Sequence, residues 1–258
     1  MAYKTEKIKT GMDELDKILI GGIPKGHTVL ISGAAGTGKT IFCLEYIYKG
    51  AKFFKEPSVY ITTEQSEQDL IKQLKTFGWD PEPLMKKNLL KIVKIDITKG
   101  DSYIHRITQL VKQIKAKRLV VDSLTTLSEF FVSADIQEKR GVELIKTIEN
   151  IIPIPLSESL VAKTTLFRLI NELKTLNCTT LLTSELPEQG NWLSRDTVSE
   201  FICDGVIILR YLEYAAGGMP RSILVRKMRG TKYDTGVFSM DITDSGIKIL
   251  PLKKGIVI

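Results

Sequence analysis

Short runs of apolar residues alternate along this chain with stretches in which apolar residues recur every three or four positions. Runs of the first kind are typical of buried strands, and stretches of the second kind are typical of helices. The predicted strands are Thr28–Ser32, Ser58–Thr62, Leu89–Ile95, Arg118–Asp122 and Thr179–Ser184, and the predicted helices are Ile41–Phe54, Glu67–Phe77, Tyr103–Ala116 and Leu166–Leu176. This alternation predicts an α/β fold with a mostly parallel, twisted sheet covered by helices on both faces.

The pattern changes from Gly205, where strand-like segments follow one another with short turns between them. These segments are Val206–Tyr214, Ser222–Met228, Val237–Ile242 and Ile247–Pro251. Short turns join antiparallel strands, so we expect an antiparallel extension of the same sheet at its C-terminal side. We find no linker, repeat or low-complexity segment and therefore expect residues 1–258 to form one domain.

One stretch, Ser133–Lys163, interrupts the alternation of predicted strands and helices. A charged segment predicts a helix over Ile136–Asn150, and the apolar hexapeptide Ile151–Leu156 follows it. Two prolines in that hexapeptide argue against a helix and against a central strand. We expect an inserted loop or arm that packs on its own domain or docks on a neighbour or ligand.

A glycine-rich motif lies between the first predicted strand and the first predicted helix. It runs Gly33-Ala34-Ala35-Gly36-Thr37-Gly38-Lys39-Thr40 and fits G-x-x-x-x-G-K-[ST], the phosphate-binding P-loop. Backbone N–H groups of such a loop surround phosphates, at the N-terminus of a helix. Lys39 would contact the β- and γ-phosphates, and the Thr40 hydroxyl would ligate Mg²⁺. A chance glycine-rich turn would lack this strand and helix, so the motif predicts binding of ATP with Mg²⁺.

Two acidic residues could complete the site. Asp122 ends the apolar strand Arg118–Asp122, which is the Walker B pattern for aligning Mg²⁺ and its waters. Many buried strands end in Asp, so this pattern gains weight only together with the P-loop. Glu64 follows the strand Ser58–Thr62, which we expect beside the P-loop strand, and it is the candidate that orients water for hydrolysis. From spacing alone, Glu64 could equally be a charge that favours a helix N-terminus.

Composition narrows the class of protein only a little. The sequence has no apolar run of transmembrane length and no signal-peptide pattern, so we expect a cytoplasmic protein without membrane insertion. Three cysteines with wide spacing predict buried thiols, and two histidines suggest no metal site of their own. The net charge of +7 either serves solubility or forms a basic surface, because the charges are mixed along the chain.

Seven further segments resemble the KaiC branch of the RecA-type ATPases, named for the cyanobacterial clock ATPase. They occur in the family's order over nearly the whole chain and are Thr10–Asp16, Gly21–Gly26, Thr63–Gln65, Phe77–Asp80, Asp204–Ile207, Lys227–Thr231 and Ile242–Gly246. The resemblance implies a RecA-type core. The chain holds one such core, whereas the clock protein holds two in tandem.

The resemblance also implies roles for individual residues. Glu64 matches the catalytic glutamate, although Gln65 stands where the clock protein has a second acid. Lys227 and Arg229 match a basic pair that reaches the γ-phosphate of the next subunit, and residues two apart on a strand point the same way. Alternatively, Lys227 and Arg229 form only a solvent-exposed basic edge of the protein and contact no nucleotide. Thr76, Met228 and Thr231 match positions that line the nucleotide pocket.

One departure concerns autophosphorylation. The second core of the clock protein carries neighbouring autophosphorylated Ser and Thr residues where this chain has Glu200 and Phe201. Neither side chain has a hydroxyl, so we expect no autokinase activity of that kind.

These observations together predict a Mg-dependent ATP hydrolase that acts as a homo-oligomeric ring, expected to be a hexamer, with nucleotide at subunit interfaces. Two alternatives stay open. One is a slow, nucleotide-gated scaffold that signals to protein partners not identified by the sequence. The other is an accessory ATPase of DNA recombination or repair, for which we expect weak, sequence-independent DNA binding.

Overall fold

A nine-stranded sheet forms the centre of the computed structural model, which describes residues 5–97, 103–129, 154–186, 193–212 and 220–252, with backbone only for 154–162. The strand order is β11-β10-β9-β8-β3-β7-β6-β4-β5. The strands are β3 (Thr28–Gly33), β4 (Ser58–Thr62), β5 (Leu90–Lys94), β6 (Arg118–Asp122), β7 (Thr179–Glu185), β8 (Gly205–Tyr211), β9 (Arg221–Met228), β10 (Val237–Thr243) and β11 (Gly246–Pro251). Strands β5, β4, β6, β7, β3 and β8 are parallel, whereas β9, β10 and β11 are antiparallel. The predicted fold class is confirmed.

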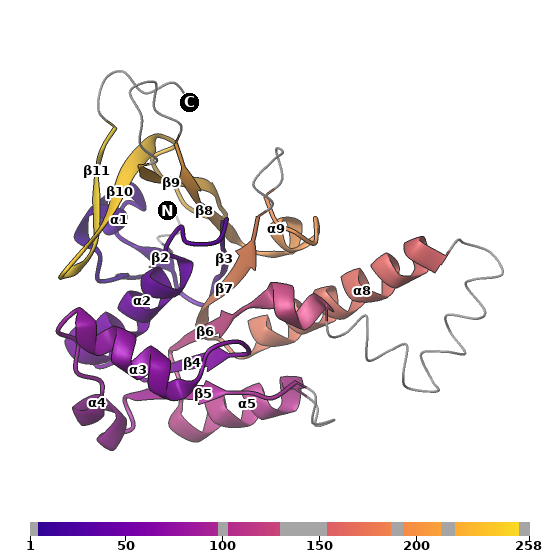
Figure 1. Cartoon of the computed structure of the whole chain (residues 1–258), viewed down its shortest axis with the longest axis horizontal. Helices are drawn as coiled ribbons and strands as arrows, with labels where there is room; N and C mark the ends of the chain where they lie inside the picture. Colours follow the sequence, from indigo (N-terminus) through magenta and orange to yellow (C-terminus); the bar gives the residue numbers. More distant parts are fainter. Residues whose placement is uncertain (1–4, 98–102, 130–153, 187–192, 213–219, 253–258) are drawn as a thin grey trace.

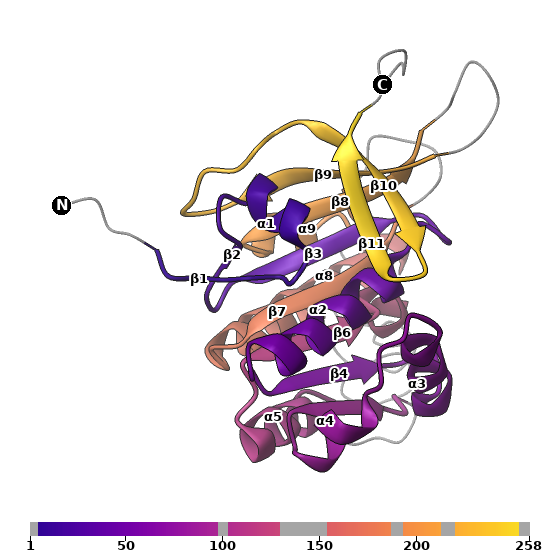
Figure 2. The same cartoon turned by 90° about the vertical axis from the view of Figure 1, so that its left-hand side faces the viewer.

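Helices cover both faces of the sheet (Figures 1 and 2). One face carries α1 (Asp13–Ile18), α2 (Lys39–Phe53), α3 (Glu67–Thr76) and α4 (Glu82–Lys86), and the other carries α5 (Tyr103–Ile114) and α8 (Ile154–Thr175). A short helix, α9 (Ser199–Ile202), precedes β8, and the strands β1 (Lys7–Ile8) and β2 (Ile23–Pro24) form a separate two-stranded sheet. No helix of the described residues is long and apolar enough to cross a bilayer.

The alternation of side chains along the strands divides the core into two layers. Val29 and Ile31 of β3 point into the layer beneath α2, whereas Leu30 points into the layer beneath α5 and α8. Both layers are closed to solvent, which explains why the central strands read as continuous apolar runs. Such a sheet, buried on both faces, leaves polar side chains to gather where the strands end.

The structure corrects the expected place of β4. We expected this strand beside the P-loop strand β3, but β7 and β6 lie between them. Strand β4 instead pairs with β6, in a register that places Thr62 opposite Asp122. The chain leaves room between β3 and β4 that later strands fill, and strands consecutive in sequence need not be neighbours in the sheet.

The first strand of the C-terminal group also differs from expectation. Strand β8 is parallel to β3, so the antiparallel extension begins with β9. Strands β7 and β8 lie on either side of β3 and both run parallel to it. Parallel strands need a crossover connection rather than a short turn, so β8 is not the start of a hairpin series. The strand ends at Tyr211, and residues 213–214 of the predicted segment lie outside the described part.

A third correction concerns the second of the two prolines, Pro155. Helix α8 begins at Ile154, within the hexapeptide Ile151–Leu156 for which we predicted no helix. Pro155 falls in the first turn of α8, where a missing N–H breaks no intrahelical hydrogen bond, so proline is tolerated there. The helix predicted over Ile136–Asn150 lies outside the described residues.

Candidate active site

The P-loop connects the end of β3 to the start of α2, as the motif predicts. Gly36 and Gly38 adopt left-handed backbone conformations, with φ of 75° and 103°. A Cβ atom on Gly33 would lie 2.6 Å from both the Leu209 carbonyl oxygen and the Thr37 hydroxyl. Glycine is therefore required at the bend, where no side chain fits between the loop and β8.

Two side chains stabilise the loop from inside. The Lys39 ammonium donates hydrogen bonds to the carbonyl oxygens of Gly33 (2.8 Å) and Ala34 (3.0 Å), and the Thr37 hydroxyl donates to Ala34 (2.8 Å). Burial lowers the pKa of Lys39, while the carboxylates of Glu185, Asp122 and Glu64 oppose that change. Lys39 is therefore a half-buried cation surrounded by acids at the carboxyl edge of the sheet.

Asp122, at the end of β6, contacts the first turn of α2. Its Oδ2 accepts hydrogen bonds from Thr40 (3.1 Å) and from the Tyr60 hydroxyl (2.5 Å), and its Oδ1 accepts one from Thr183 (2.5 Å). The side chain is 7% exposed. Hard oxygen ligands of this kind are preferred by Mg²⁺, which usually keeps several waters, so Thr40 and Asp122 fit the predicted metal site.

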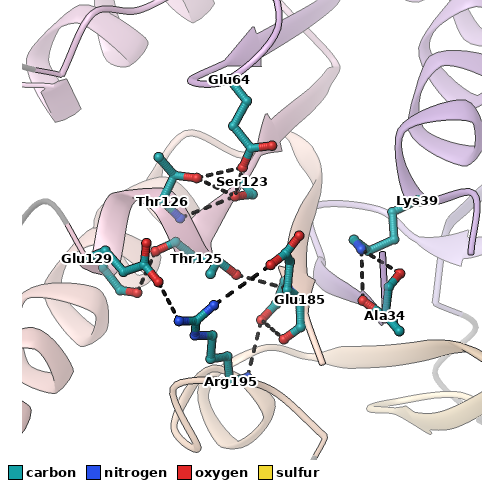
Figure 3. A network of polar contacts seen from close by, with 12 residues as sticks. Ala34, Lys39, Glu64, Ser123, Thr125, Thr126, Glu129, Glu185 and Arg195 are labelled. Carbon is teal, nitrogen blue, oxygen red and sulfur yellow. Dashed lines mark hydrogen bonds and ion pairs between the residues drawn. The ribbon is translucent and has the colours of Figure 1, made fainter. Parts of the chain in front are cut away.

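Glu64 lies two residues beyond β4, and it reaches the loop that follows β6. Its Oε1 accepts hydrogen bonds of 2.6 Å from both Ser123 and Thr126 (Figure 3). The Glu64 side chain is exposed, so a water molecule can reach it. Strand β4 is next to β6 and not to β3. Glu64 therefore contacts the segment that directly follows the Walker B strand, and it is linked to the site around Lys39 by way of that segment.

A third acidic residue, Glu185, lies at the end of β7 and was not predicted from the sequence. Its backbone N–H donates to the Thr125 hydroxyl (2.9 Å), and its carboxylate is 3.8 Å from Arg195, which also pairs with Glu129 at 2.7 Å. Figure 3 shows Glu185 between Arg195 and Lys39. Glu185 could have been predicted from the sequence as a site residue, because it directly follows the predicted strand Thr179–Ser184, at the carboxyl edge of the sheet.

Lys227 and Arg229 lie by the amino ends of the parallel strands, whereas the P-loop lies at their carboxyl ends. Lys227 pairs with Val206 near the start of β8, whereas Gly33 pairs with Leu209 further along that strand. The Lys227 ammonium donates to the carbonyl oxygens of Glu200 (2.8 Å), Phe201 (3.2 Å) and Cys203 (2.7 Å). Burial is the main cause that lowers the pKa of Lys227, and Arg229 adds to it.

Arg229 shares the Phe201 carbonyl with Lys227, at 3.0 Å, and its guanidinium is 3.6 Å from Asp204. The two cations therefore lie on the same side, as their spacing suggests. Asp204 also accepts a hydrogen bond from Lys174 of α8 (2.9 Å). Burial alone would raise the pKa of Asp204, but hydrogen bonds from Lys174 and from the Thr28 N–H outweigh it and lower the pKa overall.

Of the three residues that the resemblance places around the nucleotide, Met228 and Thr231 lie by the amino ends of the parallel strands, away from the P-loop of the same chain. Thr76 is in the last turn of α3 and bonds to the Gln73 carbonyl, and Thr231 follows β9. Met228 is buried, 4% exposed, and its side chain lies against Gly205. The structure thus groups Lys39, Thr40, Asp122 and Glu64, and it places Met228, Thr231, Lys227 and Arg229 together at the other edge.

The fold and the phosphate loop define the class of protein: a P-loop ATPase of the RecA type. The family model described as "ATPase: KaiC" matches residues 8–135 and 134–254, and the chain belongs to this family. The KaiC-like protein of the hyperthermophilic archaeon Pyrococcus horikoshii OT3 superposes with a TM-score of 0.78 at 32% identity, covering 96% of this chain and 100% of that one.

Curated relatives are longer than this chain. The circadian clock oscillator proteins KaiC of Nostoc sp. PCC 7120 and of Synechococcus elongatus PCC 7942 are each 32% identical, over 257 and 256 residues. These alignments cover 96% and 95% of this chain but 44% of either relative. The chain therefore spans less than half the length of the curated relatives it matches.

Proposed function

We propose that the chain binds ATP with Mg²⁺ at the P-loop and hydrolyses it. The observation that carries this proposal is the 3.1 Å hydrogen bond between Thr40 and Asp122, which joins the two halves of a Mg²⁺ site from segments 82 residues apart. The glycine geometry of the loop and the membership of the KaiC family support the same function.

In this mechanism Lys39 turns from its own loop carbonyls to the phosphates, which are stronger acceptors. Thr40 and Asp122 would hold Mg²⁺, and the bound ion would neutralise charge that develops on the phosphates. Glu64 accepts a proton from water as the water oxygen bonds to the γ-phosphorus, and the bond from that phosphorus to the bridging oxygen breaks with its electron pair leaving on ADP.

The remaining cations belong, in our proposal, to the site of a neighbouring subunit. Within one chain, Lys227 and Arg229 face away from the P-loop, at the amino edge of the parallel strands. A ring in which this edge meets the P-loop of the next copy, expected to be a hexamer, would let both cations stabilise transition-state charge in trans. Thr231, on the same segment, would then contact that neighbour's nucleotide, and Met228, whose side chain is buried, would do so through its backbone. Thr76 lies elsewhere, at the end of α3.

Two further proposals follow from individual positions. We expect the whole chain to act as one domain, because its nine-stranded sheet takes strands from Thr28 to Pro251. We also expect no autokinase activity at Glu200 and Phe201. Glu200 is 7% exposed, Phe201 is 70% exposed, and neither carries a hydroxyl.

Binding and hydrolysis are tested by separate variants. Lys39→Ala should abolish binding of a fluorescent ATP analogue, whereas Lys72→Ala, on the exposed face of α3, should not change it. Glu64→Gln should retain binding but lower kcat by roughly 10²–10⁴-fold, since it removes the proton acceptor. Normal analogue binding by a folded Lys39→Ala protein would refute the site, and normal kcat in Glu64→Gln would refute the role of Glu64.

A further inference from the structure

The carboxylate of Glu64 is held through one of its two oxygens. Ser123 and Thr126 both donate to Oε1, each at 2.6 Å, and the two hydroxyl oxygens are themselves 3.1 Å apart (Figure 3). Hydrogen bonds to an ionised carboxylate are shorter and stronger than bonds between neutral groups. Among the residues that the structure describes, none donates a hydrogen bond to Oε2 of Glu64.

Backbone geometry explains why these three groups meet. Strands β4 and β6 pair with Thr62 opposite Asp122, so Glu64 and Ser123 leave the same edge of the sheet within two residues of that pair. Residues 124–129 are helical, and the Ser123 hydroxyl accepts the N–H of Thr126 at 3.3 Å. A spacing of three residues at a helix start puts both hydroxyls on the same side, facing Glu64.

We propose that Ser123 and Thr126 are positioning residues that fix Glu64 through Oε1 and leave Oε2 to accept the proton of the attacking water. This inference rests on the proposed hydrolysis and adds the residues that orient its base. An exposed glutamate has several rotamers, and a base must be within hydrogen-bond reach of the proton that it takes. Two donors from a segment anchored by Asp122 restrict Glu64 to one arrangement beside the metal ligand.

Thr126 gives the cleaner test, because Ser123 is buried and adjoins Asp122. Thr126→Val removes the hydroxyl with little change of shape, and Thr126→Ser retains it. Ser128→Ala is the matched control, since Ser128 lies on the same helical turns but donates to the Thr125 carbonyl (2.8 Å). The measurements are kcat and KM for ATP hydrolysis, binding of a fluorescent ATP analogue, and the thermal midpoint Tm.

We expect Thr126→Val to lower kcat by roughly 10-fold to 100-fold, as small misplacements of catalytic groups do, with KM and analogue binding unchanged. Thr126→Ser should restore most of kcat, and Ser128→Ala should match the wild type. A structural role alone would predict a lower Tm, or a rise in KM as large as the loss of kcat.

A double-mutant cycle distinguishes the positioning role of Thr126 from the proposed role of Glu64 as the base in hydrolysis. If Thr126 acts through Glu64, Thr126→Val should have no further effect on kcat in a Glu64→Gln protein. An equal further loss in that background would overturn the positioning role, as would a normal kcat in Thr126→Val. Normal hydrolysis by Glu64→Gln alone would instead refute the proposed base, independently of Thr126.

Discussion

The Thr40 hydroxyl lies 3.1 Å from Oδ2 of Asp122, which brings the first turn of α2 against the end of β6. Asp122 is also held by Tyr60 and Thr183, so its carboxylate is fixed from three neighbouring elements. Removing Thr40 therefore leaves the position of Asp122 largely intact. The two oxygens can then be tested separately as ligands of a cation.

We expect Thr40→Val to raise the Mg²⁺ concentration required for half-maximal hydrolysis by about tenfold or more, because one of two oxygen ligands from the protein is lost. Thr40→Ser keeps the hydroxyl and should behave like the wild type. The measurement is a Mg²⁺ titration of hydrolysis at saturating ATP. An unchanged Mg²⁺ requirement in a folded Thr40→Val protein would remove Thr40 from the metal site.

The P-loop could be read from the sequence because its parts are local. Eight consecutive residues, a strand before them and a helix after them define the geometry, and the structure has each part where it was expected. Asp122 could be placed for a related reason, since the carboxyl ends of parallel strands meet at one edge of the sheet. The site that forms around Lys39 and Thr40 follows from these two facts.

The order of strands was not readable in the same way. Nothing in the sequence indicates that β7 and β6 separate β3 from β4, because this depends on where later strands find room in the sheet. The contacts of Glu64 with Ser123 and Thr126 depend on that order, and so do those of Asp122 with Tyr60 and Thr183. Hydroxyl groups on buried strands, or in the turn that follows a strand, carry no pattern of their own, so Tyr60, Ser123, Thr126 and Thr183 were missed.

The basic pair can be tested by mixing inactive proteins. If Arg229 acts across a subunit interface, a mixture of Lys39→Ala and Arg229→Ala proteins should regain part of the activity. Some interfaces would then combine an intact P-loop with an intact Arg229 from the neighbour. The measurement is ATP hydrolysis after subunit exchange, together with gel filtration in the presence of ATP.

A matched control uses Lys39→Ala mixed with Glu64→Gln. Both residues lie on the P-loop side of the same chain, so no interface of this mixture has an intact site, and activity should not return. A strictly monomeric protein with full activity would refute action in trans. Equal recovery in both mixtures would contradict the placement of Arg229 in a different part of the site from Lys39 and Glu64.

Contact with DNA should be weak and strongly dependent on salt. The net charge of +7 permits binding to phosphates, but the sequence offers no helix-turn-helix, zinc or RNP pattern that would read bases. Affinity carried by phosphate contacts falls steeply as salt rises, because binding releases counterions. We expect fluorescence anisotropy with single-stranded DNA to show binding at low salt that is lost near 200 mM salt. Tight binding that survives, or a preference for one sequence, would favour a recombination role.

The last prediction concerns the packing that holds α2, and with it the P-loop, against the sheet. Arg118 is fully buried beneath α2, where it pairs with Glu56 at 2.5 Å and donates to the carbonyl oxygens of Lys9 (2.7 Å) and Tyr46 (3.1 Å). A Cβ atom on Gly50 of α2 would lie 2.3 Å from Nε of Arg118. The guanidinium cannot move aside without losing partners that a buried charge requires.

Glycine in the interior of a helix ordinarily costs about 0.5–1 kcal/mol relative to alanine, so helix propensity predicts that Gly50→Ala stabilises the protein. We expect the opposite sign, a loss of roughly 1–3 kcal/mol, because the added methyl group overpacks the site around Arg118. Urea unfolding followed by circular dichroism measures the difference in the free energy of unfolding. A Gly50→Ala protein as stable as the wild type, or more stable, would show that the Arg118 side chain can shift to make room for the added methyl group at little cost in free energy. It would also mean that this cation does not hold α2 in place.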